Sequence, residues 1–325
     1  MRIQIICTAS PISVYGDRVT ALRWSEIFRD MGHAVEVAQH YGGTICDLMV
    51  ALNAYRCADA VLQFRKRHPE KPSIVALTGT DIYRDVAHSP KAQEAMEVAD
   101  RLVVFQPLAA QVLPEHLRKK TRLIYQSAEQ TRDPTPVDRN AFVVAVVGHL
   151  RQDKDPLRTA AASRLLPETS KIRVFQAGDA DDGDLVYQAR QEALTNRRYR
   201  YLGSIPRWKV RQLIAGSNLL VLSSLIEGGA SVISEAVVDY VPVLATRIPG
   251  NVGLLGEDYP GYFEPGDTEG LARLMYRAET DPDFYQALKT RCALLARQFR
   301  PEQEEKAWAQ LIKEVAKARR SAAKT

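Results

Sequence analysis

Short apolar runs alternate along the chain with stretches in which apolar residues recur every three or four positions. The runs are typical of strands buried on both faces, and the wider spacing is typical of helices with one apolar face. In the first half, runs lie at residues 3–9, 33–39, 47–53, 73–81, 101–107 and 121–127, and helical patterns lie at 19–33, through Phe64 and at 91–98. This alternation predicts a parallel, doubly wound α/β sheet.

The same alternation restarts after residues 129–140, a polar segment with two prolines and no periodicity, which is typical of a linker. Apolar runs follow at 142–150, 171–178 and 199–203, and helical patterns at 156–166, 184–194 and 208–217. A chain of 325 residues is long enough for two cores. We predict two Rossmann-like domains, residues 1–135 and 136–298, with the site in the cleft at the carboxyl ends of their strands.

The stretch from 221 to 251 carries the most specific candidate chemistry. An apolar strand leads into a Glu-Gly-Gly loop that starts at Glu227, and Glu235 lies about two helical turns further on. Paired glycines let phosphates approach the backbone, and the helix start directs amides and its positive dipole end toward them. A diphosphate flanked by two sugars, each held by a carboxylate, has the shape of a nucleotide-sugar. Alternatively, Glu227 caps the helix and Glu235 is solvated.

This Glu-x7-Glu pair follows a buried strand and precedes Val-Pro-Val-Leu-Ala-Thr. It resembles the donor-site signature of retaining glycosyltransferases of the GT-B fold, family 4 type. The resemblance implies that Glu227 contacts the transferred sugar and that Glu235 holds the ribose. It assigns the amides next to the sugar and diphosphate to Gly228, Gly229 and Ala230.

Near the end of the chain, Pro301 opens a helix with one apolar face. That face carries Trp308, Leu311, Ile312 and Val315. GT-B enzymes commonly send their last helix back onto domain one, so the resemblance implies a crossover helix over residues 299–325. Alternatively, the helix docks on its own domain.

The strand at 142–147 is followed by GHLRQDKDP, which begins at Gly148. This loop resembles the family's Gly-Arg-Leu followed by a lysine, whose two cations balance the donor diphosphate. Lys154 falls at the lysine position, whereas His149 replaces the arginine. Either Arg151 supplies the guanidinium donors that the family's arginine would provide, or His149 donates when protonated. Catalysis would rest on stabilising the leaving diphosphate. Alternatively, these are solvated loop cations.

Two further positions bear on the donor site. The loop at 201–206, with Gly203 and Ile205, resembles the stretch that receives the base through backbone contacts. Tyr240 stands where relatives usually carry a glycine, at the turn from a helix into a strand. We expect Tyr240 to accept another turn geometry.

Domain one offers a candidate acceptor site at the loop TASPISVYGDRVT and the helix after it. An amide-rich helix start with two guanidinium groups suits a small oxyanion. The residues concerned are Gly16, Arg18, Thr20 and Arg23. Alternatively, Arg18 and Arg23 lie on the helix surface.

Thr78, Thr80 and Asp81 follow the strand that begins at residue 73. They occupy the place where relatives put groups near the anomeric carbon. Arg247, which follows the strand after the Glu-x7-Glu helix, is assigned to the acceptor as well.

Composition narrows the class of protein. Hydrophobic residues make up 46% and charged residues 26%, as in ordinary globular proteins, and no apolar run is long enough to span a bilayer. The opening ten residues fit a buried strand rather than an export leader. Of the net charge of +5, residues 313–325 supply four, since they hold five basic residues and one acidic. We therefore expect no nucleic-acid partner.

The cysteines show no CxxC spacing, and two of them lie in apolar runs. They are Cys7, Cys46, Cys57 and Cys292. We expect them to pack as free thiols in a reducing cytoplasm, and we expect no metal site.

Longer motifs narrow the resemblance further. They are GDRVTALRW, CDLMVALNA, VALTGTDIYRD, ADRLVVFQPLA, GHLRQDKDPLR, EGGASVISEA and RIPGNVGLLGEDYPGYF. Together they resemble the selenosugar synthase (SenB-type) family, glycosyltransferases of selenoneine biosynthesis, from about Gly16 to about Asp281. VTALRW and IPGNVGLLGEDYPGYF specify this narrower family, whereas Glu-x7-Glu specifies only the superfamily.

The resemblance implies transfer of the sugar of UDP-N-acetylglucosamine or UDP-glucose to selenophosphate. Selenium attacks the anomeric carbon, UDP departs, and loss of phosphate leaves a 1-selenosugar. The expected partners are these small molecules and other selenoneine pathway enzymes, with no cofactor. Two alternatives are an ordinary family 4 transferase with a carbohydrate or lipid acceptor, and a nucleotide-sugar-binding protein without transfer.

Overall fold

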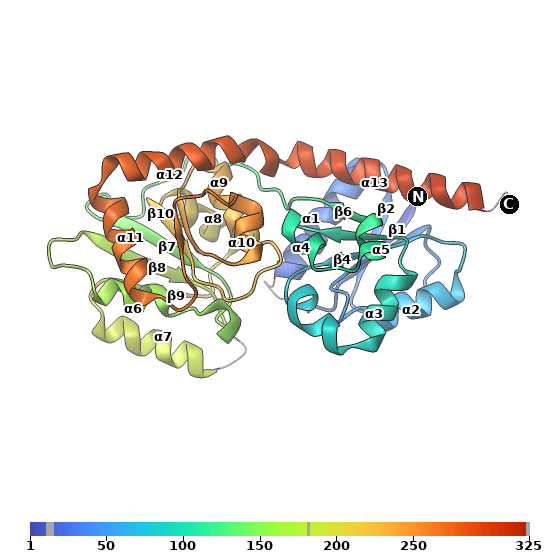
Figure 1. Cartoon of the computed structure of the whole chain (residues 1–325), viewed down its shortest axis with the longest axis horizontal. Helices are drawn as coiled ribbons and strands as arrows, with labels where there is room; N and C mark the ends of the chain where they lie inside the picture. Colours follow the sequence, from blue (N-terminus) through green and yellow to red (C-terminus); the bar gives the residue numbers. More distant parts are fainter. Residues whose placement is uncertain (11–15, 181–182, 323–325) are drawn as a thin grey trace. The chain divides into compact units, whose positions relative to one another are not determined.

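The computed structural model describes residues 1–10, 16–180 and 183–322, with side chains through residue 318 (Figure 1). Part of the predicted loop before the first helix, residues 11–15, lies outside the described residues. The chain divides into two compact units, one formed by Met1–Gln126 with Pro301–Thr325 and the other by Ser127–Arg300. The first boundary lies nine residues before the sequence-based one at 135, and the second lies two residues after the one at 298.

Within the described residues, the first unit is built on a six-stranded parallel sheet of order β2-β1-β3-β4-β5-β6. The strands are β1 (Arg2–Ile6), β2 (Ala34–Ala38), β3 (Leu48–Leu52), β4 (Ser73–Leu77), β5 (Arg101–Val104) and β6 (Thr121–Leu123). Every residue of β3 and β4 is buried, as expected for central strands covered on both faces. The direction of winding reverses between β1 and β3, which makes their carboxyl ends the switch point of this sheet.

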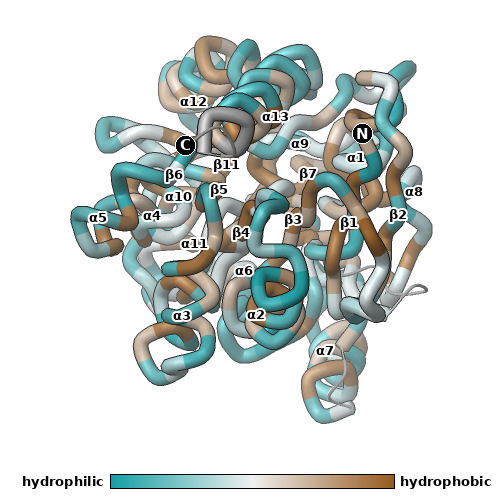
Figure 2. The backbone as a smooth tube through the Cα atoms, turned by 90° about the vertical axis from the view of Figure 1, so that its right-hand side faces the viewer, coloured by the Kyte–Doolittle hydropathy of each residue, from teal (hydrophilic) through white to brown (hydrophobic). Residues whose placement is uncertain are grey.

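Two cores cover the two faces of this sheet. Along β3, Leu48, Val50 and Leu52 belong to one core, whereas Met49 and Ala51 belong to the other, because alternate strand residues point to opposite faces. The helices are α1 (Gly16–Asp30), α2 (Ala58–Arg67), η1 (Asp81–Asp85), η2 (Val86–His88), α3 (Pro90–Val98), α4 (Pro107–Gln111), α5 (Glu115–Lys119) and α13 (Pro301–Ala322). In Figure 2 the strands β1 and β3 are largely brown, as apolar strands are.

The last helix, α13, belongs to the first unit (Figure 1). Its predicted apolar face is buried in the same core as α1: Trp308, Leu311, Ile312 and Val315 are each at most 4% exposed. The Trp308 ring packs edge-on against Trp24, with 4.6 Å between ring centroids. Aromatic pairs of this geometry stabilise a core by more than the apolar area they bury accounts for, so α13 is an integral part of this core.

The second unit repeats the architecture. Its sheet, again counted over the described residues, has six parallel strands in the order β12-β11-β10-β7-β8-β9. They are β7 (Phe142–Val147), β8 (Ile172–Ala177), β9 (Tyr199–Gly203), β10 (Leu219–Leu222), β11 (Val243–Thr246) and β12 (Tyr262–Phe263). The winding reverses between β7 and β10, so the loops after these two strands meet at the switch point.

The helices of this unit flank the sheet. They are η3 (Gln152–Lys154), α6 (Arg158–Arg164), α7 (Gly183–Thr195), α8 (Arg207–Ala215), α9 (Ser231–Val238), α10 (Pro249–Leu255), α11 (Thr268–Thr280), α12 (Pro282–Leu295) and η4 (Ala296–Phe299). Two Rossmann-like units and a C-terminal helix are the GT-B architecture that the sequence predicts, and that prediction is confirmed.

Residues 128–131, at the start of the predicted linker, are bound to the second unit. The Ala128 amide donates to the Phe299 carbonyl at 2.9 Å, and the Thr131 amide and hydroxyl donate to the Asp239 carboxylate at 2.7 and 2.8 Å. These bonds explain why the division falls at Gln126 rather than within the polar segment.

One turn in the second unit differs from expectation. Tyr240, between α9 and β11, has φ of +57° and therefore adopts the left-handed conformation that a glycine would take there. The expectation of another turn geometry is wrong, since the helix end needs this backbone shape whatever the residue. The helix-to-strand turn after α1, in the first unit, carries Gly32, with φ of +81°.

The remaining composition-based expectations concern membranes and cysteines. Within the described part of the chain, every helix is either too short or too polar to cross a bilayer. The cysteines are buried free thiols, as expected: Cys7, Cys46, Cys57 and Cys292.

Candidate functional site

At the switch point of the second unit, the loop after β7 is bound to the loop after β10. The Leu225 amide donates to the Asp153 carbonyl at 2.8 Å, and the Ser223 hydroxyl donates to the Asp155 carbonyl at 2.8 Å. Asp155 has φ of +43°, a left-handed turn that lets the loop fold back after η3. The two loops thus form one rigid surface at the carboxyl ends of neighbouring strands.

Lys154 and Glu227 lie at the centre of this surface. The Lys154 ammonium donates to Glu227 Oε1 at 2.6 Å, and the Ser224 hydroxyl donates to the same oxygen at 2.6 Å. Their side chains are 23% and 7% exposed, so the pair is largely shielded from water. Within the described residues, α9 starts after Ala230 without a side-chain cap, so the alternative that Glu227 caps this helix is wrong.

A third loop, after β11, packs against the backbone of Glu227. A Cβ atom on Gly250 would lie 2.1 Å from the Glu227 carbonyl oxygen, so this close approach requires glycine. The Thr246 hydroxyl donates to the Ser224 carbonyl at 2.5 Å, and the Asn251 amide group donates to the Thr246 carbonyl at 3.0 Å. No role was expected for these residues, although Arg-Ile-Pro-Gly-Asn after the apolar strand is a local signal for a close backbone approach.

The neighbouring cation differs from Lys154. The Arg151 side chain is 35% exposed, and its Nε lies 3.3 Å from Asp153 Oδ1. His149 is half-buried between Gly148 and Leu150 on the same loop. The solvated-cation alternative is therefore wrong for Lys154, whereas Arg151 remains partly open to solvent.

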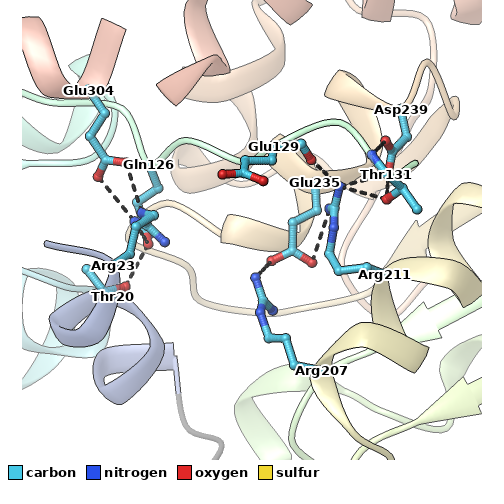
Figure 3. A network of polar contacts seen from close by, with 10 residues as sticks. All are labelled: Thr20, Arg23, Gln126, Glu129, Thr131, Arg207, Arg211, Glu235, Asp239 and Glu304. Carbon is cyan, nitrogen blue, oxygen red and sulfur yellow. Dashed lines mark hydrogen bonds and ion pairs between the residues drawn. The ribbon is translucent and has the colours of Figure 1, made fainter. Parts of the chain in front are cut away.

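Glu235 is enclosed by arginines from α8 (Figure 3). Its carboxylate is 3% exposed, accepts a hydrogen bond from Arg207 Nη2 at 2.6 Å, and lies 3.6 Å from Arg211 Nη1. The alternative that Glu235 is a solvated helix residue is wrong, because α9 turns this side of the helix toward α8. Arg207 is 47% exposed and is the loosely held member of the group.

The predicted base loop lies at the end of β9. Gly203 has φ of +68°, and its carbonyl accepts a hydrogen bond from the Gly178 amide at 2.9 Å. A Cβ on Gly178 would lie only 1.8 Å from the Gly148 carbonyl oxygen. The backbones after β7, β8 and β9 are therefore in close contact, and Ile205 lies half-buried two residues further on.

Arg247, which was assigned to the acceptor, lies at the end of β11 in the second unit. Its guanidinium stacks over the Tyr262 ring, 4.7 Å from the centroid, and its Nε lies 4.0 Å from Glu264 Oε1. The side chain is 45% exposed, so these contacts leave it accessible.

In the first unit, two of the predicted acceptor residues belong to a structural network (Figure 3). Arg23 donates to both oxygens of Glu304 in α13, at 2.9 and 3.2 Å, and Trp24 Nε1 donates to the same carboxylate at 2.7 Å. The Thr20 hydroxyl donates to Gln126 Oε1 at 2.8 Å. Glu304 is 2% exposed, and an enclosed carboxylate needs these donors.

This network corrects two expectations. Arg23 is neither an open oxyanion ligand nor a surface residue, because its guanidinium is committed to Glu304 and Gln126. Thr20 is 4% exposed and faces the same network. Arg18 differs, since within residues 1–10, 16–180 and 183–322 its buried Nε has no hydrogen-bond partner. Gly16 is exposed at the first position of α1.

Asp81 is also used internally. Its carboxylate is fully buried and accepts hydrogen bonds from the backbone amides of Ala54 at 2.9 Å, Gly79 at 2.8 Å and Thr78 at 3.3 Å. Burial raises its pKa to about 6 even though these amides favour the ionised form. Asp81 thus joins the loops after β3 and β4 and does not face a ligand, which corrects its assignment to the acceptor.

The two threonines beside Asp81 are less enclosed. Thr78 and Thr80 are half-buried, and the Thr78 hydroxyl accepts a hydrogen bond from Asn53 Nδ2 at 3.2 Å. Asn53 has φ of +79° directly after β3, a conformation that asparagine tolerates better than most residues.

The family-model comparison identifies the class of protein. The model described as "Glycosyl transferases group 1" matches residues 127–293, which is just over half of the chain and nearly all of the second unit. The chain belongs to the group 1 glycosyltransferase family.

Curated relatives match over part of their length. The chain is 30% identical over 150 residues to an Escherichia coli UDP-Gal:alpha-D-GlcNAc-diphosphoundecaprenol alpha-1,3-galactosyltransferase, covering 44% of this chain and 38% of the relative. It is 26% identical over 161 residues to the putative teichuronic acid biosynthesis glycosyltransferase TuaC of Bacillus subtilis, covering 48% and 38%. The matched segments therefore span less than half of either relative.

Solved structures match over nearly the whole chain. Anabaena HepE, in a complex with UDP and glucose, superposes with a TM-score of 0.76 and 18% identity, covering 97% of this chain and 100% of that one. Sucrose-phosphate synthase from Thermosynechococcus elongatus superposes with a TM-score of 0.79 and 16% identity, covering 98% and 99%. At these identities the likeness shows the fold.

Proposed function

We propose that the protein transfers the sugar of a UDP-sugar to an acceptor, with the donor bound at the β7–β10 switch point. The observation that carries this proposal is the Lys154–Glu227 pair, 2.6 Å apart and next to the Gly228–Ala230 segment that opens α9. A helix start and an enclosed ammonium suit a diphosphate, and a neighbouring carboxylate suits sugar hydroxyls. The structural neighbour with bound UDP and glucose supports this choice of donor.

The charges of the site suit departure of UDP. When the bond between the anomeric carbon and the diphosphate oxygen breaks, its electron pair stays on the diphosphate. Lys154 and the amides of residues 228–230 are the groups we assign to that negative charge. Because Glu227 offsets the Lys154 charge, a second cation is needed. Our candidate is Arg151 on the same loop, which is 35% exposed although Asp153 Oδ1 lies 3.3 Å from its Nε. His149 is the alternative.

For the acceptor we propose selenophosphate. The support is the motif resemblance, above all VTALRW and IPGNVGLLGEDYPGYF, together with the buried Arg18 Nε near the start of α1. A carbon–selenium bond forms as the carbon–oxygen bond to UDP breaks, and water then cleaves the selenium–phosphorus bond to release phosphate. Selenophosphate is a better nucleophile than a sugar hydroxyl and needs no strong general base.

A second acceptor class is favoured by two observations. The Escherichia coli relative is named for a GlcNAc-diphosphoundecaprenol acceptor, and the Bacillus subtilis relative is named for teichuronic acid biosynthesis. In addition, Arg23 and Thr20 are committed to Glu304 and Gln126, which removes part of the expected oxyanion pocket. A carbohydrate or lipid acceptor is therefore the alternative to selenophosphate.

The deciding experiment incubates the full chain with UDP-N-acetylglucosamine or UDP-glucose and, separately, selenophosphate, thiophosphate or a panel of sugar and polyprenyl-phosphate acceptors. Products are followed by mass spectrometry, with Lys154→Ala as the inactive control and EDTA present in a parallel series. We expect a selenosugar and UDP, formed equally with and without EDTA. Products only with sugar or lipid acceptors would favour the second acceptor class, and no UDP release with any acceptor would overturn the transferase proposal.

A further inference from the structure

Arg211 lies where α8, α9 and the first residues of the second unit meet (Figure 3). Its Nη2 donates to Asp239 Oδ2 at 2.8 Å, to the Glu129 carbonyl at 2.7 Å and to the Thr131 hydroxyl oxygen at 3.1 Å. Its Nη1 points toward Glu235, 3.6 Å from Oε2. One guanidinium therefore connects α9 to the segment that follows the boundary at Gln126.

The charges explain why an arginine stands there. Glu235 lies in α9 and Asp239 follows four residues later as its C-cap, and each side chain is only 3% exposed. Two enclosed carboxylates on one helix face repel each other unless a cation lies between them. Arg207, at 47% exposure, is accessible to solvent, whereas Arg211 is 15% exposed and contacts both acids. Arg211 is thus the enclosed counter-charge of the pair.

One atom of this arrangement is unsatisfied. Across the described part of the chain, the buried Arg211 Nη1 has no hydrogen-bond partner, because Glu235 Oε2 lies just beyond hydrogen-bond distance. A buried donor without an acceptor is costly. A small rotation of the Glu235 carboxylate away from Arg207 would satisfy it. Glu235 therefore has a different arginine at each oxygen, the exposed Arg207 at Oε1 and the enclosed Arg211 facing Oε2.

We propose that Arg211 is a positioning residue for ribose recognition and makes the site selective for ribonucleotide donors. When the ribose displaces Arg207 from Glu235, Arg211 Nη1 holds one oxygen of the carboxylate. The carboxylate then accepts hydrogen bonds from the 2′- and 3′-hydroxyls in a fixed orientation. The anchor of Arg211 is Asp239 together with Glu129 and Thr131. This inference rests on the proposed function, in which Glu235 holds the ribose of UDP.

The test compares UDP with 2′,3′-dideoxy-UDP, each titrated by calorimetry into the full chain. We expect the wild type to bind UDP about tenfold or more tightly than the dideoxy compound, since hydrogen bonds to a carboxylate are strong. Arg211→Gln and Glu235→Gln should each reduce this ratio toward about one, and the double variant should lose no more than either alone. Arg211→Lys, which keeps the charge without the fork, should give an intermediate ratio.

Arg198→Gln is the matched control. Arg198 is 7% exposed in the same unit and donates to the carbonyls of Ser170 and Pro167. Its loss should lower the melting temperature but leave the ribose ratio unchanged. If Arg211→Gln does not fold, Arg211→Lys decides the question.

The outcomes distinguish the positioning role of Arg211 from the proposed transferase function. Equal loss of affinity for both nucleotides in a folded Arg211 variant, or an unchanged ratio, would overturn the positioning role while leaving the transferase proposal in place. A wild type that binds UDP without preferring ribose would remove the role of Glu235, and the inference with it. A wild type that binds neither nucleotide would overturn the proposed function itself.

Discussion

The candidate donor site of the second unit and the candidate acceptor site of the first unit use polar side chains in opposite ways. In the second unit, Lys154 and Glu227 meet on loops that also contact each other through backbone bonds. In the first unit, Arg23 and Asp81 turn inward, one to hold the last helix and the other to join two loops. The difference shows that residue type and position after a strand indicate a polar site, but the burial of each side chain decides whether that site can face a ligand.

The largest expected effect is on catalysis. Lys154→Ala should lower turnover by about 10³-fold, since it removes a cation next to the leaving diphosphate. Initial rates and a melting curve should be measured together, with the exposed Lys171→Ala in the same unit as the control. Lys154→Arg should retain part of the activity because it keeps the charge. Wild-type turnover in a folded Lys154→Ala would place the chemistry elsewhere.

The next effect is on stability and tests the inward-turned residues. Arg23→Ala should destabilise the first unit by about 3 to 5 kcal/mol, because it leaves the buried Glu304 without its bidentate partner. Denaturant unfolding measures this loss, and the KM values of donor and acceptor measure any role in binding. A stable Arg23→Ala variant with a raised KM for selenophosphate alone would restore Arg23 to the acceptor site and break the comparison.

A pH effect should follow from Asp81. Its pKa is raised from 3.8 to about 6 by burial, so the folded state holds the proton more tightly than the unfolded state does. The stabilisation from this proton is fully present below pH 3.8 and is lost as the pH rises through about 6. The loss amounts to about 3 kcal/mol, an order-of-magnitude figure.

The measurement for Asp81 is the free energy of unfolding between about pH 4 and about pH 7, for the wild type and Asp81→Asn. The difference between the two should change with pH, because the asparagine does not titrate. Asp81→Asn should also be less stable than the wild type at low pH. In the wild type, Asp81 Oδ1 accepts a hydrogen bond from the Gly79 amide, whereas the amide group of asparagine would place a second donor against that N–H. A constant difference would mean that folding does not raise the pKa of Asp81.

The smallest expected effect is on stability and compares the left-handed turns at Tyr240 and Gly32, one in each unit. Tyr240 is left-handed at 39% exposure, so Tyr240→Gly should stabilise the second unit by about 0.5 to 1 kcal/mol. Gly32→Ala should destabilise the first unit by about 1 kcal/mol for the converse reason. The melting temperatures of both variants test these two expectations. A lower melting temperature for Tyr240→Gly would mean that the tyrosine side chain makes stabilising contacts.

The fold was predictable because its signal is local. Apolar runs marked all the strands of the first sheet, and the spacing of Trp308, Leu311, Ile312 and Val315 identified the buried face of α13. The sequence patterns predict no element over residues 252–298, although Asp267 and Asp281 cap α11 and α12 as acidic residues before a helix often do. There the available local signal was not used.

The candidate site was predictable where its parts are adjacent in sequence. Glu227 and residues 228–230 form one loop, and a second loop brings Lys154 to it. By contrast, Arg23 meets Gln126 and Glu304, which are 103 and 281 positions away. No local pattern contains such a contact, so the sequence alone could not distinguish a ligand-binding arginine from a structural one.

The placement of α13 has a consequence for biosynthesis. Residues 127–300 form a continuous unit, and all of its strands are synthesised before the last helix. The amino-terminal unit, although made first, lacks Trp308 and its neighbours in the core until the final helix emerges. Domains tend to fold in order of synthesis, but here the earlier one must wait for the later one to be completed. Until then the apolar residues of α1 and the sheet that α13 later covers lack that cover.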